Sequence, residues 1–147
     1  MLELQNETNS FSYQSNYSHL EKHKRKKILI IDDEIDFRLT LAELLTLQGY
    51  GVCTARDGIG ALNYLLEKEE VPDLIILDLN MPNMNGWDFL KQIDANDVFS
   101  KIPLMIVSGD FMVHEEEFSG RLRPVLLKPI DRLQMFQTIE NLLSDSE

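Results

Sequence analysis

Five short apolar runs, separated by segments with helical periodicity, constrain the fold of this chain more than any other feature. The runs cover residues 27–31, 51–55, 73–77, 103–107 and 123–127. Four of them are apolar through their centres, which is typical of strands buried on both faces of a parallel sheet. The run at 51–55 mixes Gly, Val, Cys, Thr and Ala, and it is predicted to be an edge strand.

Helical patterns fill the gaps between these runs. Helices are predicted over residues 39–47, 57–66, 84–93 and 131–143, with a short acidic helix within 111–118. Gly49 is expected to cap the first of them at its C-terminus. Regular alternation of strands and helices predicts an α/β fold, a doubly wound sheet with right-handed crossovers.

Length and composition predict one globular domain that follows an N-terminal tail. The chain has 147 residues, of which 44% are hydrophobic, enough to bury a core. Residues 1–26 are polar without strand or helix period, so we expect a disordered or flexible tail before a domain at 27–147. No apolar run approaches the roughly 18 residues of a membrane span, and no secretory signal is visible. The single cysteine, Cys53, cannot form an internal disulfide, which favours a cytoplasmic protein.

Charge is distributed unevenly along the chain. The net charge is −11, yet residues 1–27 carry five Lys or Arg and three Glu, which leaves −13 on the remainder. Affinity for nucleic acid depends on neutralising phosphates, so the acidic body is not expected to bind nucleic acid directly. The basic run at residues 22–27 is either a solvated flank of the first strand or a docking patch for an acidic partner or membrane surface.

Chemically capable residues follow four of the five predicted strands. They are Asp32, Asp33 and Glu34 after the first, Asp78 after the third, Ser108 after the fourth, and Lys128 with Pro129 after the fifth. Ligands of doubly wound sheets bind at the carboxyl ends of the strands, so these groups are expected to meet there. Each residue alone has a simpler explanation as a helix cap, a turn residue or a surface lysine. Their coincidence at one edge carries the prediction.

Carboxylates gathered in this way need either raised pKa values or a cation. Two of them about 4 Å apart repel by roughly 4 kcal/mol at an effective dielectric constant near 20. Oxygen ligands without neighbouring His or Cys favour Mg²⁺ over zinc. We predict Mg²⁺ held by Asp33, Asp78 and the backbone carbonyl of Asn80, with Asp32 acting through water.

The same set of residues suits phosphoryl transfer. An ionised aspartate such as Asp78 can attack phosphorus to form an acyl phosphate. Such transfer needs mainly positioning and charge neutralisation, which Mg²⁺ and Lys128 would supply from different sides. The hydroxyl of Ser108 can donate a hydrogen bond to a phosphoryl oxygen.

Four ordered motifs resemble the response-regulator receiver family of two-component systems. They are ILIIDDE at residues 28–34, LIILDLNMPNMNGW at 74–87, IVSG at 106–109 and LLKPI at 126–130. The resemblance covers about residues 27–143. It implies a flavodoxin-like, three-layer fold with a five-stranded parallel sheet in strand order 2-1-3-4-5.

The resemblance also implies a role for each site residue. Asp78 would be phosphorylated by a histidine kinase or a histidine phosphotransfer protein, and Asp32 and Asp33 would form the acidic metal pair. Ser108 would hydrogen-bond the phosphoryl group and Lys128 would pair with it. The expected chemistry is limited to self-phosphorylation and self-dephosphorylation, so the protein is not a conventional enzyme. It would be a stand-alone, chemotaxis-regulator-like receiver that switches binding to an unknown downstream protein, or an intermediate in a relay.

The resemblance has one departure and two finer implications. The family carries Tyr or Phe three residues before the lysine, where this chain has Val125. Either the smaller side chain couples the site to its output, or the output leaves by another route. Pro129 is expected to follow a cis peptide bond. Asn80 and Asp110 occupy positions that tune attack by water, and we expect fairly rapid self-dephosphorylation.

Three alternative functions fit less well. A phosphatase or phosphotransferase of the haloacid-dehalogenase type needs Asp-x-Asp after the first strand, whereas Asp32 and Asp33 are adjacent. A flavin mononucleotide carrier needs a Ser/Thr/Gly-rich loop there, where this chain has Asp-Asp-Glu. A receiver that signals without phosphate is also possible in principle, but the complete set of site residues argues against it.

Overall fold

The computed structural model describes residues 26–68, 70–113 and 123–145. Within them a single parallel sheet runs through the middle of the molecule in the order β2-β1-β3-β4-β5. The strands are β1 (Lys27–Ile31), β2 (Gly51–Ala55), β3 (Leu74–Asp78), β4 (Leu104–Ser108) and β5 (Val125–Leu127). The helices are α2 (Ile35–Leu47), α3 (Gly58–Glu67), α4 (Gly86–Asp94) and α5 (Arg132–Asp145), with a 3-10 turn η1 at Phe99–Lys101.

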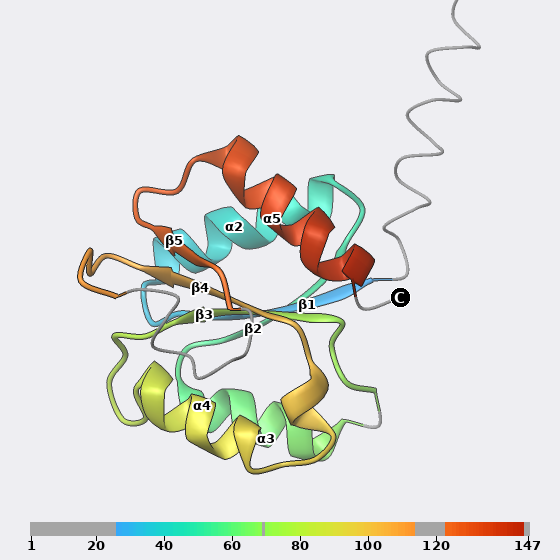
Figure 1. The fold of residues 1–147 in the computed structure, drawn as a ribbon, viewed down its shortest axis with the longest axis vertical. Coiled ribbons are helices and arrows are strands. Elements are labelled where there is room, and N and C mark those ends of the chain that lie inside the picture. The colour runs from blue at the N-terminus through green and yellow to red at the C-terminus, as the bar shows by residue number, and fades with distance from the viewer. Residues whose placement is uncertain (1–25, 69, 114–122, 146–147) are drawn as a thin grey trace, which may run out of the picture.

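The helices make two layers around the sheet. Helices α2 and α5 cover one face, and α3 and α4 cover the other (Figure 1). Ile28 and Ile30 of β1 pack toward α2 and α5, while Leu29 and Ile31 pack toward α3 and α4. Because successive side chains of a strand point to opposite faces, a strand between two helical layers must be apolar at every position. This requirement explains the continuous apolar runs of the sequence.

The predicted fold class, strand order and edge position of β2 are confirmed. The observed bounds of β1 and β2 are the predicted ones, and the observed bounds of β3 and β4 each lie one residue later than predicted. Strand β5 is shorter than predicted and begins at Val125, directly after Pro124, which has no N–H to donate to a neighbouring strand. The tail expected at 1–26 and the helix expected within 111–118 lie largely outside the described residues.

The turn after α2 shows why a glycine stands there. Gly49 adopts φ 92°, in the region that glycine enters without steric cost. Its N–H donates to the carbonyl of Thr46 at 3.0 Å, and the N–H of Tyr50 donates to that of Leu45 at 3.2 Å. This pair of bonds is a Schellman motif, so the predicted cap at Gly49 is confirmed.

Several apolar residues that contribute to the helical periodicity of the sequence are exposed in the structure. Leu39 and Leu47 of α2 are 56% and 66% exposed, and Leu133 of α5 is 68% exposed. The 3.6-residue period marks a broad stripe, whereas the sheet covers only its centre, where Leu41 and Leu45 are buried. Among the described helices, none is long and apolar enough to cross a membrane.

Candidate metal and phosphoryl site

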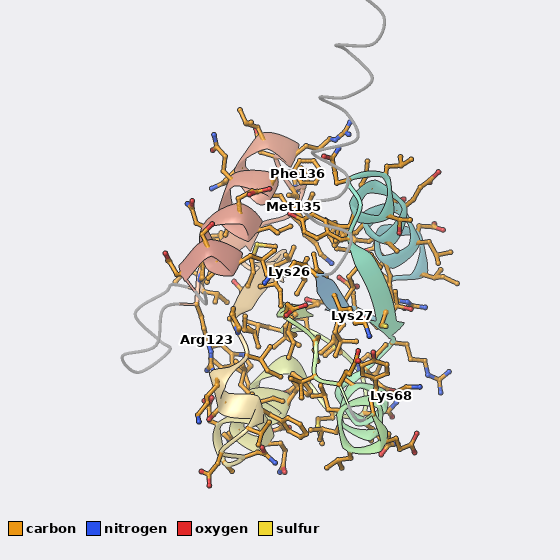
Figure 2. The ribbon with its side chains drawn as sticks, turned by 90° about the vertical axis from the view of Figure 1, so that its right-hand side faces the viewer. Lys26, Lys27, Lys68, Arg123, Met135 and Phe136 are labelled. Carbon is orange, nitrogen blue, oxygen red and sulfur yellow. The ribbon has the colours of Figure 1, made fainter. Side chains whose placement is uncertain are left out.

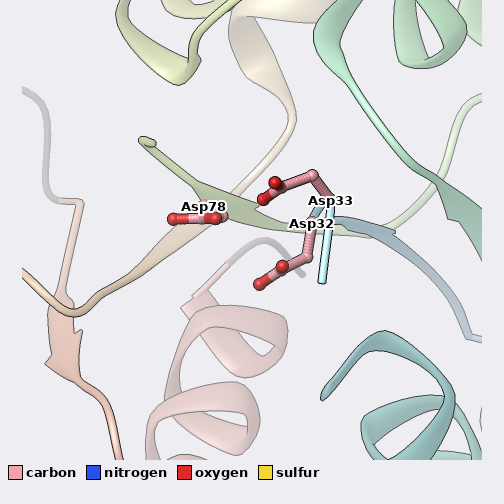
Figure 3. Close-up of side chains that lie close together, drawn as sticks. All are labelled: Asp32, Asp33 and Asp78. Atoms are coloured by element: carbon pink, nitrogen blue, oxygen red, sulfur yellow. The ribbon is translucent and has the colours of Figure 1, made fainter. Parts of the chain in front are cut away.

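Three carboxylates gather where β1 and β3 end. Asp32 and Asp33 follow β1, and Asp78 is the last residue of β3. One oxygen of each lies within 4.8 Å of the others, and Figure 3 shows the three side chains side by side. Asp32 and Asp78 are buried, at 1% and 5% exposed, whereas Asp33 is open to solvent. The predicted convergence of these residues is therefore present.

Asp32 is fixed by hydrogen bonds on every side. Its backbone N–H donates to the carbonyl of Ala55 at 3.1 Å, which extends the pairing of β1 with β2. Its Oδ1 accepts from the N–H of Glu34 at 2.8 Å, so the side chain closes the turn that leads into α2. Its Oδ2 accepts from Nζ of Lys128, also at 2.8 Å. The orientation of Asp32 is thus set before any ligand binds.

Lys128 reaches the cluster from the end of β5. The peptide bond to Pro129 is cis, as expected, and the N–H of Lys128 donates to the carbonyl of Ser108 at 2.8 Å. Besides Asp32, its Nζ lies 3.7 Å from Oε2 of Glu34 and 3.9 Å from Oδ2 of Asp78. Burial alone would lower the pKa of Lys128, but its hydrogen bond to Asp32 and the charge of Asp78 hold that pKa above its usual value.

The surroundings of Asp78 disfavour its ionised form. Burial, with the charge of Asp32 as the second cause, raises the pKa of Asp78 to about 6. Lys128 and a hydrogen bond from the N–H of Asn80, 3.2 Å from Oδ1, act in the opposite direction without cancelling the shift. One ammonium therefore does not balance three carboxylates, and a cation bound among them would stabilise the ionised form of Asp78.

Ser108 stands on the neighbouring strand at the same edge. Val107 of β4 is the register partner of Asp78, and Ser108 is the next residue. Ser108 is fully buried, and its Oγ accepts from the N–H of Asp110 at 3.0 Å. This bond uses the oxygen of the hydroxyl as an acceptor and does not occupy its hydrogen.

The loop between β3 and α4 is held against the start of α3. Asn83 adopts φ 65°, and its Nδ2 donates to Oδ2 of Asp57 at 3.3 Å. Asp57 also caps α3, since its Oδ1 accepts from the N–H of Gly60 at 2.7 Å, and this bond chiefly lowers the pKa of Asp57. Met84 packs on Gly58 so closely that a Cβ there would lie 2.8 Å from Cγ of Met84. The sequence indicated Asp57 only as a helix start, and nothing in it pointed to Asn83.

Gly86 explains another constraint on this loop. A Cβ on Gly86 would lie 2.5 Å from Cα of Leu79 and 2.6 Å from the carbonyl oxygen of Asp78, so only glycine fits. Its N–H donates to the carbonyl of Leu79 at 2.9 Å. The first turn of α4 therefore lies directly against the backbone that carries Asp78.

The donor set fits the predicted ion. Three carboxylate oxygens are hard ligands, and the solvent-exposed position of Asp33 leaves room for waters, which Mg²⁺ retains. His and Cys take no part in this cluster, which argues against zinc. The part of Asn80 that was predicted to bind metal is its backbone carbonyl, and that assignment stays a prediction.

Comparison with known proteins agrees with this geometry. Residues 28–140 match the family model of the response regulator receiver domain. The chain belongs to this family. It is 34% identical over 107 residues to the sporulation initiation phosphotransferase F of Bacillus subtilis (strain 168), covering 72% of this chain and 84% of that protein. It is 30% identical over 124 residues to the polar-differentiation response regulator DivK of Brucella anthropi, covering 82% and 98%.

A solved structure of the same fold places the site in context. The response regulator TrrA of Thermotoga maritima, solved in complex with Mg²⁺ and BeF, superposes with a TM-score of 0.70 at 25% identity, covering 80% of this chain and 98% of that one. The receiver domain formed by residues 28–140 of the present chain is a signalling module of two-component and phosphorelay systems. The phosphatase alternative is not favoured.

Val125 remains the departure from the family pattern. In the structure it is half-buried and packs with Val113 against the core on the α3 and α4 side of the sheet. The position that carries an aromatic ring in the family is thus filled by a small side chain that packs against the core.

Proposed function

We propose that Asp78 accepts a phosphoryl group from a histidine kinase or a histidine phosphotransfer protein in a Mg²⁺-dependent reaction. The observation that carries this proposal is the cluster of Asp32, Asp33 and Asp78 with Lys128 as its only described ammonium contact. A carboxylate oxygen of Asp78 would attack phosphorus, and the bond from phosphorus to the donor's imidazole nitrogen would break. The electron pair of that bond returns to the imidazole.

Each remaining residue has a defined part in this step. Asp33, Asp78 and the carbonyl of Asn80 would hold Mg²⁺, and Asp32 would reach it through water. The bound ion supplies charge neutralisation and orients the phosphoryl oxygens. Lys128 is already 3.9 Å from Oδ2 of Asp78 and needs little movement to pair with a phosphoryl oxygen. Ser108 would donate its hydroxyl hydrogen to another.

The switch follows from the charge that phosphorylation adds. A phosphoryl group brings roughly −1.5 to −2 charge. Ser108 would turn toward it and release the N–H of Asp110, which now donates to its Oγ. The loop after β4 would then shift and change the binding of a downstream protein. Because Val125 offers no large ring to follow this movement, we propose that the loop itself carries the change.

Further proposals concern the rest of the chain. Residues 1–26 would be a flexible tail and residues 27–147 the receiver domain. A relay role is supported by the name of the Bacillus relative, a phosphotransferase. A cytoplasmic location is supported by Cys53, a free thiol, since such thiols persist in reducing compartments.

Intact-mass measurement with acetyl phosphate and Mg²⁺ tests the acceptor directly. We expect the wild-type protein to gain the mass of one phosphoryl group, and Asp78→Asn and a sample with EDTA to gain none. Asp97→Asn, which removes an exposed carboxylate elsewhere, should behave as wild type. A mass gain that persists in Asp78→Asn, or steady hydrolysis of a generic phosphate ester, would overturn the proposal.

A further inference from the structure

The ammonium of Lys128 has two contacts that the proposed chemistry does not use, one with the carboxylate of Glu34 and one with an aromatic ring. Its Nζ lies 4.2 Å from the centre of the Phe37 ring. Phe37 is on the first turn of α2, half-buried, and packs against the core between α2 and α5. A cation at this distance from an aromatic ring is attracted by the negative charge of the ring face.

The surroundings make this contact more than incidental. The side chain of Lys128 is only 19% exposed, so its ammonium is partly desolvated, and cation–π attraction grows as water is removed from the contact. One side of the lysine borders a cavity of about 560 Å³, lined by Phe37, Leu41, Ile130 and Met135 among others. Two groups that line this cavity contact the ammonium, the Phe37 ring and the carboxylate of Glu34. The Glu34 side chain is 63% exposed, whereas Phe37 is half-buried, so the ring is the less solvated of the two contacts.

The position so held is the resting one. With Phe37 beside it, Nζ is 2.8 Å from Oδ2 of Asp32 and 3.9 Å from Oδ2 of Asp78. In this position Lys128 occupies an oxygen of the carboxylate cluster. A divalent cation that draws on Asp32 competes with that ion pair, since both are attracted to the same buried charge.

We propose that Phe37 is a positioning residue that holds Lys128 on Asp32 and thereby weakens cation binding at the cluster. The competition with a cation rests on the proposed function, whereas the contact itself does not. The consequence is that α2 and its cavity are linked to the state of Asp78. Any movement of Lys128 toward a group on Asp78 changes the distance between its ammonium and a ring on α2.

Nuclear magnetic resonance of the metal-free protein tests the contact. Protons on a carbon that lies over an aromatic ring are shifted upfield, so the Cε protons of Lys128 should show that shift. We expect Phe37→Leu and Phe37→Met, which keep an apolar side chain without a ring, to remove it. Phe37→Tyr keeps the ring and should restore it. Phe136→Leu removes a ring from the same core layer on α5 (Figure 2) and should leave the shift unchanged.

Calorimetric titration with Mg²⁺ tests the competition in the same variants. A lost cation–π contact corresponds to a dissociation constant for Mg²⁺ that is about two- to fivefold lower in Phe37→Leu and Phe37→Met. Phe37→Tyr and Phe136→Leu should match the wild type. The two ringless variants guard against misfolding of either one, and the dispersion of the amide resonances confirms the fold of each.

The outcomes separate this inference from the proposed function. If Lys128 shows no upfield shift in the wild type, or if Mg²⁺ binds the ringless variants no tighter, the role of Phe37 is wrong while the proposed function stands. If the wild type shows the shift and binds no Mg²⁺ at all, the proposed function fails, and the competition fails with it.

Discussion

The two ends of the sheet differ in how their charged side chains are paired. At the amino ends of the strands, carboxylates are matched with donors. Arg123 donates NH1 to Oδ2 of Asp94 at 3.0 Å, the N–H of Lys27 donates to Oδ2 of Asp73 at 2.7 Å, and the Lys27 ammonium pairs with Glu70. Figure 2 shows Lys27 and Arg123 at this end of the molecule. At the carboxyl ends, Asp32, Asp33 and Asp78 lie together, and the ammonium of Lys128 contacts Asp32 and Asp78 but has no described contact with Asp33.

This difference in charge pairing distinguishes the amino-end edge of the sheet, which is structural, from the carboxyl-end edge, which can bind a ligand and react. Opposite charges in contact satisfy each other and need no ligand. Like charges that are buried together store unfavourable energy, and a bound cation can release it. Burial by itself does not distinguish the two ends, because Arg123 and Asp78 are both 5% exposed. The balance of charge around each group does.

The largest effect is expected when the pair at the amino end is broken. Arg123→Met keeps an apolar stem but removes the guanidinium that pairs with Asp94. Removing one partner of a buried ion pair costs about 3–5 kcal/mol, and because the Asp94 side chain is 39% exposed we expect about 2–3 kcal/mol here. Urea denaturation measures the loss.

The control for this change is Arg56→Met. The Arg56 side chain is 82% exposed and lies 3.8 Å from Asp57, and exposed pairs contribute little. Equal stability of the wild type and Arg123→Met would show that the amino end does not depend on its paired charges.

The opposite sign is expected at the carboxyl end. Because the pKa of Asp78 is raised from 3.8 to about 6, folding becomes costlier as pH rises from about 4 to about 6, and the full cost applies above 6. Below pH 4 the carboxyl is protonated in both states and the cost is absent. A shift of this size corresponds to about 3 kcal/mol, and solvent screening reduces the cost. Asp78→Asn should therefore raise the free energy of unfolding at pH 8 by about 2 kcal/mol without metal, and leave it nearly unchanged near pH 3.5.

Denaturation in urea with EDTA at the two pH values measures this difference, with Asp97→Asn as the control. A variant that is less stable than the wild type at pH 8 would mean that the carboxyl end is charge-balanced like the amino end.

The fold was predictable because its determinants are local. Strands β1, β3 and β4 lie between two helical layers, and this burial leaves continuous apolar runs in the sequence. The residues after each strand were predictable for the same reason, since parallel strands bring their ends to one edge. The exposure of Leu39 and Leu133 was not predictable, because the helical period does not determine which part of an apolar stripe meets the sheet.

Contacts between side chains far apart in sequence were beyond prediction. Asn83 donates a hydrogen bond to Asp57, 26 residues away. The Phe37 ring contacts the ammonium of Lys128, and both residues line the same cavity. Each depends on how two loops or helices pack in space, and neither residue stands out by type or spacing. The carboxylate cluster was predictable, whereas the contacts that adjust it were not.

A cation bound among the three carboxylates should neutralise part of their charge, so that charges at the carboxyl end become paired as they are at the amino end. A ligand that binds only the folded state stabilises it by about 1.4 kcal/mol at ten times its dissociation constant. We expect Mg²⁺ to raise the melting temperature of the wild type, and Asp33→Asn to lose most of the increase. Raising the concentration of a monovalent salt to the same ionic strength is the control. If that salt has the same effect, the cluster responds only to screening.

The smallest effect concerns Asp57, a buried carboxylate at the carboxyl end that is paired in the manner of the amino end. The N–H of Gly60 is the main cause of its lowered pKa, and Asn83 adds a second donor. Its contribution to stability is present above the unfolded pKa near 4 and is lost as pH falls through the lower folded value. Asp57→Ala should therefore destabilise the protein at pH 8 by about 1 kcal/mol, the cost of a lost helix cap.

The comparison of Asp57→Ala with Asp78→Asn isolates the role of local pairing. Both changes remove a buried carboxylate near the same edge, and they should move the free energy of unfolding in opposite directions at pH 8. Asp57→Asn retains a side chain that caps helices well, so it should recover most of the loss. If Asp57→Ala also stabilises the protein, the excess of negative charge extends over the whole carboxyl end, and the site is not confined to the three carboxylates around Asp78.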